Sequence, residues 1–121
     1  MPGGIDYAPS SIVNSTGLDF RIAMRYTRQV IKSFAHKGLE KFFRTGSTAG
    51  IQAKHAKRLR VQLGMLDCAR KPEDMNAPGW RLHRLQASLQ GHWSIAVSGN
   101  WRVTFRFEGE DAILVDYRDY H

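Results

Sequence analysis

The last three residues of the chain, Asp119, Tyr120 and His121, combine an acid, a phenol and an imidazole. They end a run, AILVDYRDYH, whose composition is typical of a β-strand. Alternation along a strand would place Asp119 and His121 on one side and Tyr120 on the other. Imidazole titrates near neutral pH without perturbation, so this strand end is suited to acid–base chemistry. A solvated polar end is the simpler interpretation of these three residues taken alone.

Two more polar residues, His83 and Arg102, lie in the middle of predicted strands. A single strand histidine is more often a hydrogen-bonded structural residue than a functional one. Two histidines, an arginine and a carboxylate on the strands of one basic domain favour a functional set. RNA cleavage requires a base for the ribose 2′-hydroxyl, a cation for the phosphorane and an acid for the leaving 5′-oxygen. The nucleophile belongs to the substrate, so this chemistry needs no metal.

Motifs for other chemistries are not found in the sequence. It contains no CxxC or HExxH zinc motif and no GxGxxG or GxxxxGKS phosphate loop, so neither a metal nor a cofactor is expected. The remaining histidines are His36, His55 and His92. His36 and His55 belong to a predicted helical region, where a surface or boundary position is expected.

The formal net charge of +7 over 121 residues suits a polyanion, which the charge alone leaves open as nucleic acid, the ribosome or an anionic membrane face, and it also fits an acidic partner. Part of this charge lies on one predicted helix, at Lys54, Lys57, Arg58 and Arg60. These side chains form either the solvated face of an amphipathic helix or a surface that contacts phosphates. The single cysteine, Cys68, is expected in the core and agrees with a cytoplasmic protein. We find no signal peptide and no apolar run long enough to span a bilayer, so no membrane-spanning segment is expected, and a membrane is not among the expected partners.

The spacing of apolar residues predicts an α+β domain, with two helices packed on one face of an antiparallel sheet that follows them in the chain. The predicted elements are a β-prone run at 30–34, helices at 36–46 and about 51–69, and strands at 80–85, 92–97, 100–107 and 112–121. Gly46 is the expected stop of the first helix. The apolar stripe of the second helix consists of Ile51, His55, Leu59, Leu63 and Leu66.

Four segments of the chain carry a family resemblance: VIKSFAHKGLEKFFRTGSTAGIQAKHAKRLR, WRLHRL, GHWSIAVSGNWRVTFRF and DYRDYH. In this order they resemble the HigB (killer protein) branch of the RelE/ParE toxin superfamily, over Val30 to His121. The resemblance implies a RelE-like fold and the toxin of a type II toxin–antitoxin pair. Such a toxin cleaves mRNA in the ribosomal A site and so arrests translation and growth. Its implied partners are the ribosome, mRNA and a HigA-like helix-turn-helix antitoxin, through which it reaches operator DNA.

By this resemblance, the catalytic residues are His83, Arg102, Asp119, Tyr120 and His121. His83 and His121 would act as acid and base, in an order left open, and Arg102 would neutralise the scissile phosphate. Asp119 would orient or tune a neighbouring imidazole, and Tyr120 would pack against a base or position a phosphate. Contacts to RNA or the ribosome are expected from Lys54, Lys57, Arg58, Arg60, Arg84 and Asn100.

Two departures from the family pattern keep alternatives open. Many relatives carry a basic loop of the Pro-Leu-Lys-Gly-Asp-Arg type where this chain has Arg84 followed by LQASLQ. One alternative is therefore a catalytically weak homologue that acts in the toxin–antitoxin complex and at the operator, and another is a ParE-like gyrase inhibitor. Relatives begin at the residue that matches Val30. Residues 30–121 are thus the expected toxin domain, and residues 1–29 a dispensable segment that is either a flexible extension or a start-site artefact.

Overall fold

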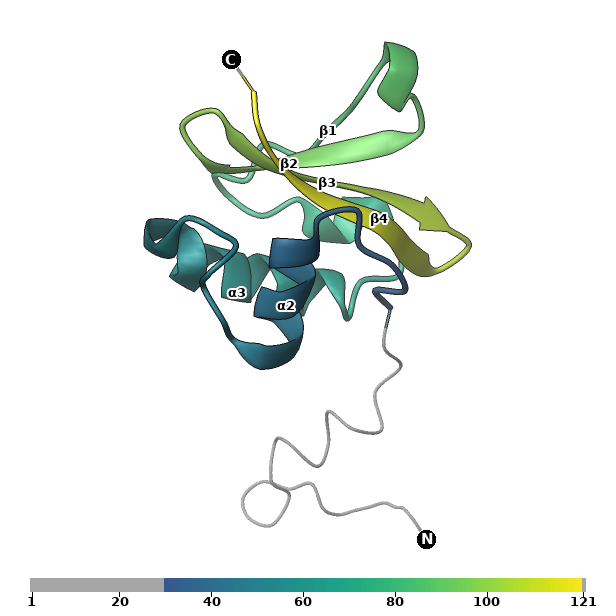
Figure 1. Cartoon of the computed structure of the whole chain (residues 1–121). Helices are drawn as coiled ribbons and strands as arrows, with labels where there is room; N and C mark the ends of the chain where they lie inside the picture. The colour runs from purple at the N-terminus through teal and green to yellow at the C-terminus, as the bar shows by residue number, and fades with distance from the viewer. Residues whose placement is uncertain (1–29, 121) are drawn as a thin grey trace, which may run out of the picture.

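Two α-helices pack on one face of a four-stranded antiparallel sheet in the computed structural model, which describes residues 30–120 (Figure 1). The helices are α2 (Lys37–Thr45) and α3 (Ala56–Leu66), and the 3₁₀ turns are η1 (Ala53–His55), η2 (Pro72–Met75) and η3 (Ala87–Leu89). The strands are β1 (His83–Arg84), β2 (His92–Ser98), β3 (Trp101–Glu108) and β4 (Asp111–Asp119), which pair in chain order. This arrangement confirms the predicted α+β fold. The expectations for residues 1–29 lie outside the described residues.

The first helix, α2, has the predicted position and the predicted stop. At its start the His36 Nδ1 atom accepts a hydrogen bond from the Leu39 N–H at 2.9 Å, which caps the helix. At its end Gly46 adopts a left-handed φ of 84°, and its N–H donates to the Phe42 carbonyl. The buried side chains Leu39 and Phe42 attach the helix to the core.

The second helix is shorter than the predicted 51–69, because it begins as the turn η1 and ends at Leu66. Asp67 stops it by a long-range contact: its Oδ1 atom accepts from the N–H groups of Val30 and Ile31, at 3.1 and 3.0 Å. The predicted apolar stripe is confirmed, since His55, Leu59, Leu63 and Leu66 are buried and Ile51 is partly buried. The expected core position of Cys68 is wrong, because this residue follows the helix and is exposed.

Residues 30–34 lie along β4 without forming a regular strand. Two parallel bridges join Ile31 to Ala112 and Phe34 to Val115. The Lys32 N–H donates to the Ala112 carbonyl at 2.8 Å, and Val30 is only 2% exposed. This segment therefore ties the beginning of the described chain to the strand that leads to the C-terminus.

The strands β2 and β3 agree with the sequence prediction to within one residue, and Gly99 and Asn100 form the turn between them. The predicted strand at 80–85 is wrong in length, because only His83 and Arg84 pair with β2. Arg81 has a φ of 54°, which no extended strand accommodates. Trp80 is buried, and its carbonyl accepts from the Ala96 N–H beyond the end of β1.

A β-bulge in β4 changes which of its residues face the helices. The register between β3 and β4 shifts between Thr104 and Arg106, opposite Leu114, whose φ is 55°. Before the bulge Ala112 is buried, and after it Val115 and Tyr117 are buried while Leu114 is exposed. The side chains that alternate with Val115 and Tyr117 consequently point away from the helices.

The core lies between the helices and the sheet and joins distant parts of the sequence. Its largest fully buried apolar side chains are Leu39, Leu59, Leu63, Leu66, Met75, Ile95, Val103, Phe105 and Val115. Burying one such side chain stabilises a fold by about 1.5–3 kcal/mol, so this layer holds the strands in place beneath the polar face. Within residues 30–120, neither α-helix has the length and apolar character needed to cross a bilayer.

Candidate active site

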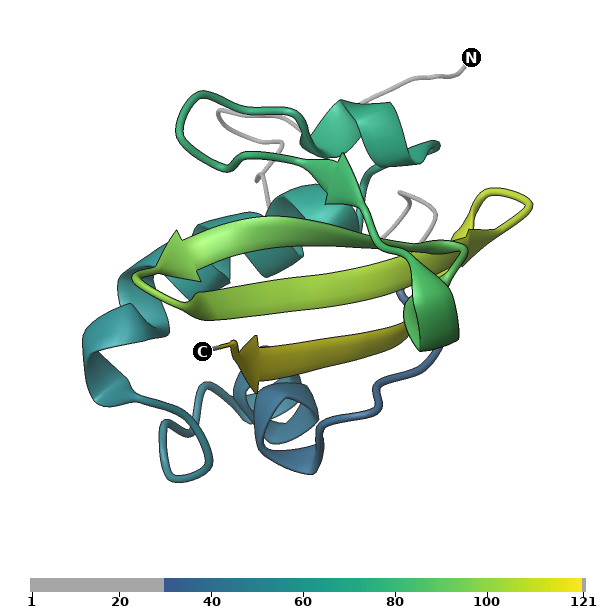
Figure 2. The ribbon, with the colours of Figure 1, turned by 90° about the horizontal axis from the view of Figure 1, so that it is seen from above.

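The face of the sheet opposite the helices carries most of the candidate site, and Figure 2 looks onto it with the helices behind. Residues paired across strands share a face, with Cβ atoms roughly 4.5–5.5 Å apart. The pairing registers assign to this face His83, His92, Ser94, Ala96, Arg102, Thr104, Arg106, Ile113, Asp116 and Arg118. We call this set the open face. Ser94 and Thr104 are short and buried in its middle, so the charged side chains form its surface.

His83 lies on β1, at one edge of the open face, and is exposed. Its Nδ1 atom is 3.0 Å from the Arg81 carbonyl oxygen. A carbonyl only accepts, so this contact favours the tautomer in which Nδ1 carries the proton and donates it. Nε2 is then the unprotonated atom of the neutral ring and is able to take a proton from a substrate hydroxyl.

Arg102 lies at the start of β3 and is held by the hairpin turn. Its Nη1 atom donates to the carbonyl oxygens of Gly99 at 2.7 Å and Trp101 at 3.0 Å. These two bonds fix the guanidinium beside the turn that contains Asn100. The guanidinium group is planar, so its remaining N–H groups point in fixed directions that match the oxygens of a phosphate group.

The C-terminal residues lie beside the same turn. The backbone N–H of Tyr120 donates to the Asn100 carbonyl at 2.9 Å, and Asp119 pairs with Trp101. Strand alternation gives Tyr120 the same face as Arg118, and Asp119 the helix-covered side with Tyr117. His121 lies outside the described residues. The structure therefore brings Asn100, Arg102 and Tyr120 together, and places the Asp119 side chain on the other side of the strand.

Sequence reasoning missed a charged pair on the open face, Asp116 and Arg118. The Arg118 Nε atom lies 2.9 Å from Asp116 Oδ2, and Asp116 Oδ1 accepts from the Tyr117 N–H at 2.8 Å. The hydrogen bond to Asp116 raises the pKa of Arg118 above its ordinary value, and the Tyr120 side chain contributes to this increase. Alternation with the apolar residues Val115 and Tyr117 is the sequence signal that would have identified the pair.

His55 is buried, which agrees with its place in the predicted apolar stripe and not with the surface or boundary position expected for a helical histidine. Its Nδ1 atom is 2.6 Å from the Tyr117 hydroxyl oxygen, and that oxygen accepts a hydrogen bond from the Gln52 N–H at 3.3 Å. Trp101 stacks on Tyr117, with ring centroids 4.5 Å apart. This cluster of rings joins η1 to the ends of β3 and β4. It supports the strand segment that carries Asp119 and Tyr120 from the helix side.

Burial has opposite consequences for the two hydrogen-bonded groups of this cluster. Desolvation, with a smaller effect from Lys54, lowers the pKa of His55, so the folded protein favours its neutral imidazole. Desolvation also raises the pKa of Tyr117, and the charge of Asp119 adds to that increase, while the Gln52 N–H opposes it. The imidazole of His55 and the hydroxyl of Tyr117 are therefore both uncharged around neutral pH.

We expect the free energy of unfolding to fall as the pH decreases below about 6.5, the ordinary pKa of histidine. In that range the unfolded chain protonates His55 while the folded chain does not, so protons favour unfolding. A His55→Asn variant keeps a polar group near Tyr117 but does not titrate. Urea unfolding at pH 7.5 and 5.5 measures the effect, and the variant should lose less stability than the unaltered chain over this interval. Equal losses would contradict the assignment.

The basic residues of the second helix lie on the helix layer and not on the open face. Lys54, Lys57, Arg58 and Arg60 are exposed, as the solvated-face and phosphate-binding interpretations both require. Arg58 Nη2 donates to the Gly79 carbonyl at 3.2 Å and to that of Ala96 at 3.4 Å. Arg60 lies over the Phe42 ring at 5.5 Å. The two arginines thus contribute to packing, and Lys54 and Lys57 are the better candidates for a partner.

Arg84 lies next to His83 but packs toward the edge of the sheet. Its guanidinium carbon is 5.2 Å from the centre of the Trp93 ring. Both residues line a cavity of about 310 Å³ together with Leu85, Gln86, Gln90 and Gly91. The segment that follows Arg84 therefore folds back toward β2 and forms one wall of this cavity. Among residues 30–120, no group of three His, Cys, Asp or Glu side chains is arranged to hold a metal ion.

Two comparisons relate this chain to known proteins. The family described as HigB-like toxin, a RelE-like toxin of the type II toxin–antitoxin system HigB, matches residues 32–121. A relative, Endoribonuclease HigB of Proteus vulgaris, is 41% identical over 92 residues. That similarity covers 76% of this chain and 100% of the relative. The matched residues include all those described for the open face.

Proposed function

The chain belongs to the HigB-like family of RelE-like toxins of type II toxin–antitoxin systems, and on that basis we propose that it is an endoribonuclease that cleaves mRNA on the ribosome. The relative's name supports the nuclease activity. The proposed partners are an antitoxin of the HigA type, the ribosome and mRNA, in the cytoplasm. Cleavage would arrest translation and growth.

One observation carries this proposal: the hydrogen bond from the Tyr120 N–H to the Asn100 carbonyl. It joins the end of β4 to the turn before Arg102, so Tyr120 lies beside the turn to which the Arg102 guanidinium is bonded. His83 lies on the same side of the sheet, at the other edge strand. This placement of His83, Arg102 and Tyr120 on one side of one sheet supports the proposal, since a catalytic set needs a common scaffold.

We assign roles by the chemistry of RNA cleavage through the 2′-hydroxyl. His83 and His121 would act as base and acid, and the bond from His83 Nδ1 to Arg81 suits a base at Nε2. Arg102 would stabilise the charge that develops on the phosphorane. Tyr120 would position a base or a phosphate, and Asp119 would act from the helix side on the orientation of the C-terminal residue. The nucleophile lies within the substrate, so the proposed mechanism requires no metal.

The exposed lysines of the second helix are proposed to dock the protein on ribosomal RNA. We expect a Lys54→Gln/Lys57→Gln variant to bind ribosomes more weakly and with a smaller salt dependence, by roughly one unit of slope for each phosphate that is no longer neutralised. A matched control is Lys37→Gln/Lys41→Gln, which removes the same charge from exposed positions of α2. Sedimentation with ribosomes at several salt concentrations measures both. Equal behaviour of the two variants would mean that only net charge matters.

The function is tested by inducing the chain in a bacterium and mapping the 5′ ends of its transcripts. New ends in frame with codons, and only in translated messages, would support the proposal. Growth arrest with a DNA-damage response would instead support a gyrase inhibitor. Normal growth with normal transcripts would support a homologue that acts mainly in complex with its antitoxin.

A further inference from the structure

Two arginines lie directly opposite each other on the open face. Arg102 of β3 and Arg118 of β4 are paired in the register of the sheet. Like charges in directly opposite positions destabilise a strand pair. The Asp116 carboxylate offsets part of this repulsion, because it forms an ion pair with Arg118 at 2.9 Å. A bound anion that contacts both guanidinium groups would offset the remainder.

Each of the two guanidinium groups already makes a hydrogen bond or ion pair within the protein. Arg118 uses Nε for Asp116, and Arg102 uses Nη1 for the carbonyls of Gly99 and Trp101. Arg118 remains 43% exposed at its side chain, whereas Asp116 is only 18% exposed. Asp116 therefore holds Arg118 through Nε, and the Tyr120 side chain also hydrogen-bonds to this arginine. The exposed part of the guanidinium remains accessible to a ligand. Both groups are oriented before any ligand binds, which reduces the entropic cost of binding.

We propose that Arg118 and Arg102 together form a binding site for one phosphate group of the RNA strand, with Asp116 as the residue that positions Arg118. The inference rests on the proposed ribonuclease function. It adds to that function a phosphate contact from a residue outside the predicted set. Two planar guanidinium groups on adjacent strands suit the oxygens of a phosphodiester, to which arginine binds in bidentate fashion.

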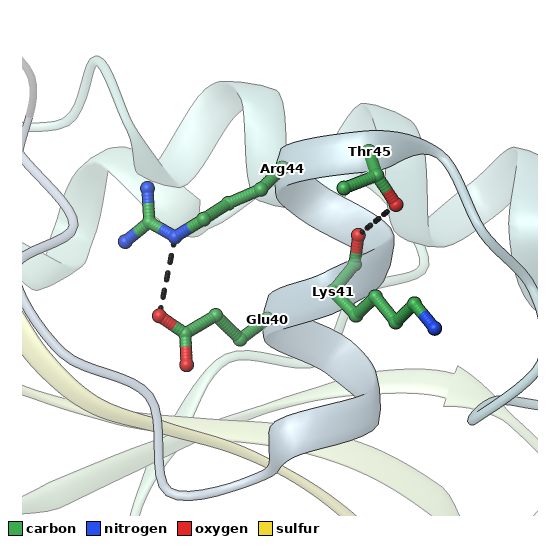
Figure 3. A network of polar contacts seen from close by, with 4 residues as sticks. All are labelled: Glu40, Lys41, Arg44 and Thr45. Atoms are coloured by element: carbon green, nitrogen blue, oxygen red, sulfur yellow. Dashed lines mark hydrogen bonds and ion pairs between the residues drawn. The ribbon is translucent and has the colours of Figure 1, made fainter.

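The chain offers a matched control in Arg44 of α2. Arg44 binds Glu40 through Nε, as Figure 3 shows. The Nε–Oε2 distance is 3.1 Å, close to the 2.9 Å between Arg118 Nε and Asp116 Oδ2. Arg44 is 54% exposed at its side chain and lies on the helix layer. Replacing either arginine with glutamine removes one positive charge and one exposed ion pair. Only the Arg118 change removes a group from the open face.

The test measures binding of a short single-stranded RNA whose 2′-hydroxyls are O-methylated, so that cleavage cannot occur. We expect Arg118→Gln to weaken binding about tenfold or more, because it removes a charge-assisted hydrogen bond to phosphate. The slope of log affinity against log salt should decrease by roughly 0.7, the value for one phosphate of a single strand that is no longer neutralised. Arg44→Gln should change neither quantity, and Arg118→Lys should retain the slope but bind more weakly than arginine.

Equal losses of affinity in the Arg118→Gln and Arg44→Gln variants would overturn the proposal, since only net charge would then matter. Unchanged binding by Arg118→Gln would overturn it as well. Thermal unfolding of each variant checks the fold, and Arg118→Lys provides the test if the glutamine variant does not fold. Because binding is measured without cleavage, the outcome is separate from that of the proposed function. A chain that binds RNA through Arg118 but cuts no transcript would refute the nuclease activity alone.

Discussion

His121→Ala is expected to reduce mRNA cleavage by about 10²–10⁴-fold, the usual contribution of a general acid or base. The residue ends the Asp-Tyr-His motif, and the preceding Tyr120 is held next to Asn100 and Arg102. The buried side chains of β4 end at Tyr117, so the substitution should leave the core packing intact. Single-turnover cleavage on ribosomes with a defined message measures the effect.

A second histidine provides the control for this experiment. His92 is paired with Arg106 on the same sheet and has no role in the proposed mechanism. A His92→Gln variant should cleave at a rate close to that of the unaltered chain, provided that its melting temperature is unchanged. Near-normal cleavage by a well-folded His121→Ala variant would eliminate His121 as the acid or the base.

Arg102→Ala is expected to slow the cleavage step by about 10²-fold or more, which is typical when one group that stabilises transition-state charge is removed. Arg102→Lys should recover only part of this loss, because an ammonium group cannot reproduce the planar donor fork of guanidinium. Lysine also cannot match the two bonds from Nη1 to Gly99 and Trp101. The rate at saturating ribosome concentration and the apparent affinity should therefore be measured separately.

The control for Arg102 is the next arginine on the same side of β3. Arg106 is exposed, lies four residues along the strand and pairs with Ile113, at a distance from the C-terminal motif. Arg106→Ala should affect affinity more than rate. A change confined to apparent affinity in Arg102→Ala would argue against a role in the transition state.

Local sequence signals predicted much of the fold. The helix α2 and its stop at Gly46 depend on neighbouring residues, and so does the hairpin turn at Gly99 and Asn100. The parts that could not be predicted depend on distant residues. Asp67 ends α3 because it binds Val30 and Ile31, and β1 is short because Arg81 leaves the extended conformation. Neither constraint has a pattern in the local sequence.

The same distinction applies to the candidate site. His83, Arg102 and the C-terminal motif could be proposed from their residue types and from a family resemblance. The contact of His55 with Tyr117 could not be predicted, because it joins residues that are 62 positions apart. Arg118 was not singled out, although it alternates with the apolar residues Val115 and Tyr117. Counting from the beginning of β4 would give it the wrong face, because the bulge at Leu114 changes the alternation.

The bulge at Leu114 reverses the order in which the residues of β4 alternate between the two faces of the sheet. Counting outward from the buried Ala112 by twos gives Leu114, Asp116 and Arg118 as the inward set, which is the reverse of what the folded strand shows. One extra residue thus decides which face of the sheet each residue of β4 after Leu114 occupies. Related chains are therefore best aligned backward from their C-termini in this region, since a gap placed before the bulge exchanges the inner and outer faces of every later residue.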